Sequence, residues 1–222
     1  MNSGSAKVAK LPTIRRLPSY LYLLRPLREA GEEFVSGTYL AAQLKLDPVQ
    51  VRKDLEVTGI VGRPRIGFRV DNLIDAIEEY LGWHNTTEAF LIGVGSLGTA
   101  LLGYPGFEMH GVNIVAAFDR DPAKVNTEIR GKLVLPMEKL PEMVRRLRVR
   151  IAIMAVPAES AQAVVDELIA ARIQGIWNFS HTALQVPPGI IVQNEDLSIG
   201  LAVLSKKMAM AEAGQQDAAI AG

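Results

Sequence analysis

The six residues from Gly93 to Gly98 constrain the fold of this chain more than any other feature. They read Gly-Val-Gly-Ser-Leu-Gly, between the apolar stretch Ala89–Val94 and a helical stretch from Thr99 to Gly103. A G-x-G-x-x-G pattern between a strand and a helix is typical of dinucleotide-binding folds. In such a fold the first glycine permits a tight turn, the second admits a pyrophosphate, and the third packs the helix on the strand. The pattern predicts cofactor contacts from the whole loop: Gly93, Val94, Gly95, Ser96, Leu97 and Gly98.

A second apolar strand, Val112–Phe118, ends at Asp119, which lies 21 residues beyond Gly98. This spacing is close to that of the acid that binds the ribose hydroxyls in dinucleotide-binding folds. The carboxylate would repel a 2′-phosphate, so the sequence favours NAD(H) over NADP(H), although the adjacent Arg120 weakens that inference slightly. The alternative interpretation is a glycine turn that serves packing and binds nothing.

Strands and helices continue to alternate after Asp119. We expect strands at 150–157, 175–179 and 190–193, and a helix at 160–172. This alternation predicts a parallel, doubly wound sheet, whose ligands lie beyond the carboxyl ends of the strands. Four residues at strand ends are candidates for the wall of a nicotinamide site: Val156, Pro157, Asn178 and Phe179. For Asn178 and Phe179, the alternative roles are turn chemistry and core packing.

The first 70 residues predict a separate module. Helices are expected over 13–30, over 37–44 after the N-cap Ser36, and over 49–57 after Asp47 and Pro48. Pro26 is expected to kink or end the first helix. Two short strands, 60–61 and 66–70, and a helix over 70–81 follow. This order is typical of a winged helix–turn–helix.

The distribution of charge fits DNA binding by this module. The chain has 24 basic and 24 acidic residues, but residues 1–70 hold 12 of the basic and only 6 of the acidic ones, so they carry +6 and the remainder −6. Polar side chains on the third helix and arginines on the hairpin loop suit the two grooves of DNA. The alternative is a protein-binding winged helix with a solvated basic face. The candidate DNA contacts are Ser36, Gln50, Arg52, Lys53, Arg63 and Arg65.

Several classes of site and location are not expected. Cysteine is absent and the three histidines are scattered, so the sequence predicts no metal site, no disulfide and no thiol chemistry. No secretory signal or membrane span is visible, which favours a cytoplasmic protein. The basic run Arg145–Arg150 reads as the solvated end of a helix, with phosphate contact as the alternative.

The rival functional hypothesis is a small NAD-dependent oxidoreductase with His181 as proton donor. No substrate domain fits beside the dinucleotide fold, and nothing in the sequence pairs with His181 to orient it. We therefore expect the chain not to be an enzyme. The last predicted helix, 196–213, carries Leu197, Leu201, Leu204 and Met208 on one side, which suggests packing on another subunit.

Residues 50–55, Gln-Val-Arg-Lys-Asp-Leu, together with the glycine loop and Tyr104-Pro105-Gly106-Phe107, resemble the redox-sensing transcriptional repressor family Rex. The resemblance extends from Ile14 to Met208. It implies a homodimer that exchanges its last helix, binds double-stranded operator DNA when free or carrying NAD⁺, and releases the DNA when NADH binds. It also implies that Tyr104 and Asp196 join a switch network near the nicotinamide.

Two features depart from the family pattern. Tyr22 occupies the slot of the first-helix arginine that the family uses in this network, with Arg16 and Arg25 nearby. The hairpin loop has Pro64 and Arg65 at its middle, so the operator sequence could differ. The expected fold class is α/β: an N-terminal winged helix–turn–helix at 11–84, a Rossmann-like doubly wound parallel sheet at 85–194 that binds NAD(H), and a C-terminal dimerisation helix at 195–213.

Overall fold

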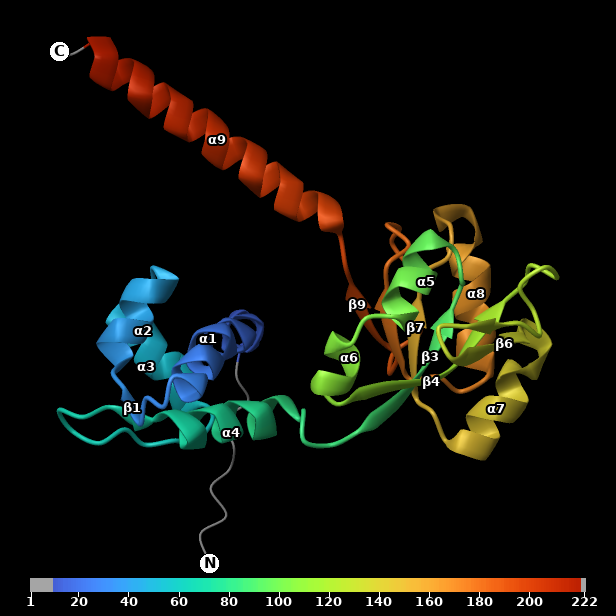
Figure 1. The fold of residues 1–222 in the computed structure, drawn as a ribbon. Coiled ribbons are helices and arrows are strands. Elements are labelled where there is room, and N and C mark those ends of the chain that lie inside the picture. Colours follow the sequence, from blue (N-terminus) through green and yellow to red (C-terminus); the bar gives the residue numbers. More distant parts are fainter. Residues whose placement is uncertain (1–9, 221–222) are drawn as a thin grey trace, which may run out of the picture. The chain divides into compact units, whose positions relative to one another are not determined.

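The computed structural model describes residues 10–220, except for the side chains of Leu197 and of 213–220, and divides the chain into two units (Figure 1). The first unit runs to Thr86 and includes Glu108–Gly111; the second comprises Thr87–Phe107 and the chain from Val112 onward. Each unit has its own apolar core.

The first unit is built from four helices and a two-stranded sheet. In chain order these are α1 (Leu11–Glu29), β1 (Phe34–Val35), α2 (Gly37–Leu44), α3 (Pro48–Glu56), β2 (Phe68–Arg69) and α4 (Val70–Leu81). The predicted caps are present, because Ser36 accepts a hydrogen bond from the Tyr39 N–H and Asp47 accepts one from the Val49 N–H. The helices share a core to which α1 gives Leu17, Tyr20, Leu21 and Leu24, and α4 gives Leu73, Ile74 and Ile77.

Pro26 does not end the first helix, which was one of the two outcomes expected, because α1 continues to Glu29. A proline this close to a helix end removes only one backbone hydrogen bond. Tertiary contacts stabilise the last turn, in which Leu24 is buried and Arg25 forms an ion pair with Glu78 of α4 at 2.8 Å.

The hairpin that follows α3 also differs from the prediction. Ile60–Val61 is not a strand; β2 instead pairs with β1, which the sequence did not predict, in the antiparallel register Val35↔Phe68. The wing is a short loop closed by a bridge between Arg63 and Gly67. Gly67 has φ +103°, and a Cβ there would overlap the Val35 carbonyl oxygen, so β1 and the wing approach more closely than a side chain would allow.

The second unit contains a seven-stranded sheet in the order β5-β6-β4-β3-β7-β8-β9. All neighbouring strands are parallel except β5 and β6. The bounds are β3 (Thr87–Ile92), β4 (Val112–Asp119), β5 (Glu128–Ile129), β6 (Lys132–Pro136), β7 (Ile151–Met154), β8 (Gly175–Asn178) and β9 (Ile191–Asn194). Apart from β5, this is the strand order of a Rossmann fold, with its switch point between β3 and β7.

Helices cover both faces of this sheet. Along β3, Phe90 and Ile92 face the core under α7 (Leu140–Leu147) and α8 (Ala158–Ala170), whereas Ala89 and Leu91 face the core under α5 (Ser96–Leu102) and α6 (Gly106–Met109). A short 3₁₀ helix, η1 (Met137–Lys139), leads into α7. The sequence did not predict β5 and β6, and α5 begins at Ser96, three residues earlier than predicted. The sheet is therefore mostly, and not wholly, parallel.

The last helix, α9 (Leu197–Ile220), is longer than predicted. Its apolar side chains Leu201, Leu204 and Met208 are 65%, 55% and 56% exposed. The sequence predicts Leu197 on the same side, but its side chain lies outside the described part of the chain. Within the described residues, α9 thus has an apolar surface that the chain itself does not bury.

Candidate functional site

The glycine loop joins β3 to α5 at the switch point of the sheet. Gly93 has φ +89°, and a Cβ there would lie 2.6 Å from the Ala155 carbonyl oxygen after β7. A Cβ on Gly98 would overlap the Gly93 carbonyl oxygen, so the third glycine permits the helix to pack on the turn. These two roles agree with those expected from the pattern.

The second glycine faces open space. A Cβ on Gly95 would meet nothing within 4 Å, and Gly95 is the N-cap of α5 without a side-chain cap. The first N–H groups of the helix, beginning at Ser96 and Leu97, are therefore directed at a space that an anion can enter. The loop offers the cradle that a pyrophosphate requires.

Asp119 stands at the end of β4, next to this loop. Its carboxylate accepts hydrogen bonds from the N–H groups of Val94, at 2.7 Å, and Asp121, at 2.9 Å, and Lys124 Nζ lies 3.5 Å away. Burial alone would raise the pKa of Asp119, but the two N–H donors and Lys124 hold that pKa below its ordinary value. Asp119 is thus an anion at neutral pH, as an acceptor for ribose hydroxyls must be.

A cavity of 270 Å³ lies between the loop and the start of α8. It brings together five of the predicted residues, namely Gly93, Gly95, Asp119, Val156 and Pro157. Eight further residues of its wall were not predicted as contacts, among them Arg120, Lys124 and Met137. The first two follow the acid at the strand end, and this position is the signal that could have revealed them. Nothing in the sequence around Met137 points to the cavity.

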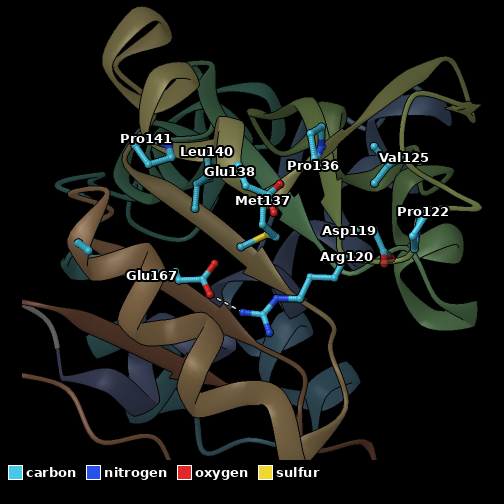
Figure 2. Close-up of a pocket in the computed structure, with 11 residues that line it drawn as sticks. Asp119, Arg120, Pro122, Val125, Pro136, Met137, Glu138, Leu140, Pro141 and Glu167 are labelled. Atoms are coloured by element: carbon cyan, nitrogen blue, oxygen red, sulfur yellow. Dashed lines mark hydrogen bonds and ion pairs between the residues drawn. The ribbon is translucent and has the colours of Figure 1, made fainter.

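An outer cavity of 860 Å³ adjoins the first, and the two share Asp119, Arg120 and Met137. Figure 2 shows Arg120 reaching across it to form an ion pair with Glu167 of α8, with Leu140 and Pro141 farther along the wall. The guanidinium is thus held in place beside the site predicted for the ribose. Together the two cavities offer a phosphate cradle, a ribose acceptor and an apolar wall, which fits a dinucleotide.

Asn178 lies at the end of β8 and its side chain is buried. Its Oδ1 accepts from the Ser180 N–H, and its Nδ2 donates to the Thr182 carbonyl and to Asn194 Oδ1. These bonds fasten the following turn and the end of β9. The alternative role considered for Asn178, turn chemistry, therefore accounts for its polar atoms.

Four aromatic rings form a row that contains two predicted residues. Tyr104 contacts Phe107, Phe107 contacts Trp177, and Trp177 contacts Phe179, with ring centroids 5.1–5.5 Å apart. Tyr104 is exposed at one end of the row and Phe179 is partly buried at the other. The row lies over the face of the sheet that α5 and α6 cover.

Asp196 and His181 are neighbours, which corrects the expectation that nothing pairs with His181. The His181 Nδ1 lies 3.7 Å from Asp196 Oδ1, a distance that suits an ion pair with a protonated histidine but exceeds hydrogen-bond length. Asp196 also accepts from the Ser198 N–H at 2.8 Å, and Ser198 holds the pKa of Asp196 below its ordinary value. Both side chains are exposed, and neither lines the two cavities.

In the first unit, α3 presents Arg52 and Lys53 to solvent, and neither forms an ion pair within the described residues. Gln50 lies on the same helix, but its Nε2 donates to Asp54 Oδ1 at 2.8 Å. Since an ionised carboxylate only accepts, this bond fixes which way the Gln50 amide points. Ser36 is exposed at the start of α2, with its hydroxyl oxygen accepting the capping bond.

The wing presents its two arginines differently. Arg65 is exposed at the tip with φ +64°, whereas the guanidinium of Arg63 lies 5.8 Å from the centre of the Phe34 ring. Arg69 approaches the same ring at 6.0 Å and pairs with Glu33 at 3.2 Å. The Phe34 ring therefore supports the base of the wing and leaves Arg65 free at its tip.

Among the described residues, no group of three or more histidine, aspartate or glutamate side chains is arranged to hold a metal ion. The helices described here include none with the length and apolar character needed to cross a bilayer.

Comparison with protein families matches two segments. Residues 8–56 are similar to a family described as a putative DNA-binding protein N-terminus, and residues 84–182 to a family described as a CoA binding domain. The two matches fall on the helix–turn–helix and on the Rossmann-like sheet respectively.

Whole-chain relatives carry one name. A protein of Treponema denticola, named redox-sensing transcriptional repressor Rex, is 48% identical over 91% of this chain and 96% of its own length. A Rex of Bacteroides fragilis is 40% identical over 93% of this chain and 94% of its own.

Solved structures of RSP, described as a Rex-family repressor, superpose closely. The first has a TM-score of 0.86 at 30% identity and covers 95% of this chain and 98% of its own. Two more, with TM-scores of 0.85 at 30% identity, are described as complexes of RSP with NAD⁺ and operator DNA and with NADH. They cover 95% of this chain and 97% and 98% of their own.

Proposed function

This chain belongs to the Rex family of redox-sensing transcriptional repressors, and we propose that it represses transcription by binding operator DNA and releases that DNA when NADH binds. The observation that carries the proposal is that one chain contains both a basic helix–turn–helix and a dinucleotide-binding fold. Arg52 and Lys53 stand exposed on the second helix of a helix–turn–helix, and an open glycine cradle lies beside an ionised Asp119. RSP, which has the same fold, is described in complexes with NAD⁺ and operator DNA and with NADH.

For the DNA, we propose that α3 enters the major groove. Gln50, Arg52 and Lys53 would contact base edges and phosphates there, and Ser36 would approach the backbone from the start of α2. Arg65 at the wing tip would enter the adjacent minor groove, where the negative potential is strongest, with Arg63 behind it. The supporting features are the exposure of these basic side chains and, within the described residues, their lack of ion pairs.

For the cofactor, we propose NAD(H), held by the residues of 85–194. The glycine loop would bind the pyrophosphate, and Asp119 would accept from the ribose hydroxyls. Val156 and Pro157 would line the site, and the Tyr104–Phe179 aromatic row would lie toward the nicotinamide. Asp196 is the remaining candidate for the switch network. When bound, the nicotinamide supplies the difference between the two redox states, a hydride and one unit of charge.

We propose a homodimer in which residues 195–213 form the subunit contact, residues 11–84 bind DNA, and the protein acts in the cytoplasm, where DNA and the nicotinamide pool meet. The support for a dimer is the unburied apolar side of α9. Two helix–turn–helix units in a dimer read half-sites whose spacing must match, so a change in the arrangement of subunits releases DNA.

The switch is a shift between two populations. NADH changes DNA affinity only through its differential affinity for the DNA-competent and DNA-incompetent arrangements. A complete reversal of the populations, from 99:1 to 1:99, requires about 5.5 kcal/mol of such differential binding. NAD⁺ must bind the two arrangements with much more similar affinities than NADH does if the repressor is to respond to the ratio of NADH to NAD⁺.

The test is a titration of the full chain with palindromic DNA that the protein selects from a random library. NADH should release this DNA at concentrations at which NAD⁺ does not. Coenzyme A is tested as a control, because residues 84–182 are similar to a CoA binding domain, and it should not release the DNA. Equal effects of NADH and NAD⁺ would overturn the proposal.

A double variant tests the DNA surface. Arg52→Ala/Lys53→Ala should weaken DNA binding and reduce the slope of log affinity against log salt by about 1.8, since each lost phosphate contact contributes about 0.9. NADH affinity should not change. The matched control, Lys132→Ala/Lys139→Ala, removes two lysines of the second unit and should leave both properties unchanged. Loss of NADH binding by the first variant would contradict the separation of roles.

We infer further that the chain catalyses no hydride transfer. The relatives are named repressors, and His181 lies outside both cavities. Incubation with NADH or NAD⁺ and a panel of 2-hydroxy acids, 2-oxo acids and imines should give no turnover. Turnover that disappears in His181→Ala would favour the oxidoreductase alternative.

A further inference from the structure

A third cavity, of 580 Å³, lies where α7 and α8 end and β7 begins. Its charged lining consists of Arg145, Arg148, Arg150 and Arg172, and its other lining residues are valine, alanine and proline. No carboxylate lines it in the part of the chain that the structure describes. The cavity shares Pro141 and Ala170 with the outer dinucleotide cavity and no residue with the inner one, and none of its arginines lines either. The arginines therefore form a strongly basic group apart from the two dinucleotide cavities.

The four arginines have no charged partners, unlike their neighbours. Arg146 on the same helix pairs with Glu142 at 3.8 Å, and Arg120 pairs with Glu167. Within residues 10–220, no ion pair involves any of the four that line the cavity. All four side chains are exposed, and an anion that enters the space between them would be attracted by each guanidinium group.

Two of these arginines occupy backbone positions that favour glycine. Arg148 follows α7 with φ +55°, and Arg172 follows α8 with φ +73°. Residues other than glycine, asparagine and aspartate rarely adopt this left-handed backbone conformation. Helices end most readily here with a glycine, so an arginine at both positions sacrifices some stability to place two guanidinium groups.

The helix ends explain only part of this charge. The C-termini of α7 and α8 each carry a partial charge of about −0.5, which cations stabilise. Together they offset about one of the four guanidinium charges. About three positive charges remain for a ligand, and the valines of the wall, Val144 and Val149, are buried and keep the floor of the site apolar.

We propose that this cavity binds a small metabolite with two or more phosphate groups, at a site distinct from that of NAD(H). The guanidinium fork matches phosphate oxygens in two-point contacts, and four of them suit a polyphosphate better than a single phosphate. The volume falls within the range of small-molecule sites, about 300–1,000 Å³. The concave shape favours a small ligand over duplex DNA, whose backbone is met by side chains that project from a surface.

The experiment uses the full chain saturated with NADH, so that the dinucleotide site is occupied. Calorimetric titration with inorganic tripolyphosphate at low salt should show one site per chain, and inorganic phosphate should bind at least about tenfold more weakly. Arg148→Gly/Arg172→Gly should weaken tripolyphosphate binding by about a hundredfold, since each charge-assisted contact is worth about tenfold. Because glycine suits both positions, this variant should melt no lower than the parent protein.

The matched control is Arg130→Gly, which removes an arginine from another left-handed position, with φ +52°, outside the cavity. It should bind tripolyphosphate as the parent does. A second variant, Arg145→Ala/Arg150→Ala, keeps the test valid if the glycine variant fails to fold. Absence of binding by the parent, or equal weakening by Arg130→Gly, would overturn the proposal. The proposal would also be overturned if the cavity variants lost more affinity for a random-sequence DNA duplex than for tripolyphosphate, each relative to the parent protein.

Discussion

At the scale of single residues, Asp54 connects the proposed recognition helix to the core. This fully buried carboxylate on α3 accepts from Arg16 at 2.6 and 2.7 Å, from the Thr13 and Tyr20 hydroxyls at 3.0 Å each, and from Gln50 at 2.8 Å. Burial alone would raise the pKa of Asp54, but these donors, led by Arg16, hold that pKa below its ordinary value. Burial and the Asp54 charge in turn raise the pKa of Tyr20. Asp54 thus fixes both the position of α3 on α1 and the orientation of Gln50.

Replacing Asp54 should therefore destabilise the first unit strongly. Asp54→Asn leaves Arg16 without its counter-charge, and breaking one side of a buried ion pair typically costs about 3–5 kcal/mol. Urea unfolding followed by circular dichroism measures the change. Glu78→Gln, which breaks the more exposed pair with Arg25, is the matched control and should cost less than about 1 kcal/mol. Equal losses for the two variants would contradict this role of Asp54.

The pH dependence of the free energy of unfolding should also reveal the contribution of ionised Asp54. The folded-state pKa of Asp54 lies below its unfolded value of about 3.9, so its contribution is fully present above that pH and is lost as the pH falls through the folded pKa. The stability difference between the parent protein and Asp54→Asn should thus be constant from pH 5 to 7, to within about 0.5 kcal/mol, and shrink below about pH 4. A difference that grows on acidification would show that Asp54 is not ionised in the folded state.

At the scale of elements, the glycine loop is fixed by contacts that a single methyl group would break. A Cβ on Gly98 would overlap the Gly93 carbonyl oxygen, so Gly98→Ala should push α5 away from the turn. We expect NADH affinity to fall by about tenfold or more, equivalent to about 1.4 kcal/mol, as measured by NADH fluorescence. Gly175→Ala is the control, because its Cβ would meet Ile151 at an ordinary 3.5 Å, and NADH affinity should stay unchanged.

The wing depends on a glycine in the same way. Gly67→Ala would force an unfavourable left-handed conformation and an overlap with the Val35 carbonyl, which separates the wing from β1. DNA affinity measured by gel shift should fall, while NADH affinity should persist. Gly59→Ala, where φ is +78° but no atom lies within 4 Å of the new Cβ, should have the smaller effect. Unchanged DNA affinity in Gly67→Ala would mean that the wing does not contribute to DNA binding.

Local signals predicted the elements that local chemistry controls. Ser36 and the Asp47–Pro48 pair start α2 and α3 as expected, and the glycine pattern lies at the predicted junction of strand and helix. The two-residue strand β1 was missed because its pairing with β2, more than 30 residues away, leaves no periodic pattern in the sequence. The burial of Asp54 was missed for a similar reason, since it depends on Arg16, 38 residues earlier in the chain.

At the scale of the whole molecule, the two units divide the proposed functions, and the net charge of zero conceals a basic part and an acidic part. The apolar side chains Leu201, Leu204 and Met208 of α9 are exposed. The proposed DNA surface and the nucleotide cavities lie on different units, and in the proposed homodimer the contacts between chains would couple them.

Disrupting α9 should separate the chains. Leu201→Lys/Leu204→Lys places two charges on the apolar side of the helix, and we expect a monomer by light scattering, with DNA affinity reduced because two half-sites are no longer read together. The control Lys206→Ala/Lys207→Ala changes charge on the same helix without adding it to the apolar side. A dimer that survives the first double variant would assign the subunit contact to another surface.

The aromatic row has a spectroscopic consequence. The chain has two tryptophans, of which Trp83 belongs to the first unit and Trp177 to the row between Phe107 and Phe179 in the second. Reduced nicotinamide absorbs light where indole emits, and oxidised nicotinamide does not. In the proposed site, NADH would therefore quench the emission of Trp177 by energy transfer while NAD⁺ would leave it bright. With Trp83→Phe as background, the repressor would become an optical probe of its own redox input.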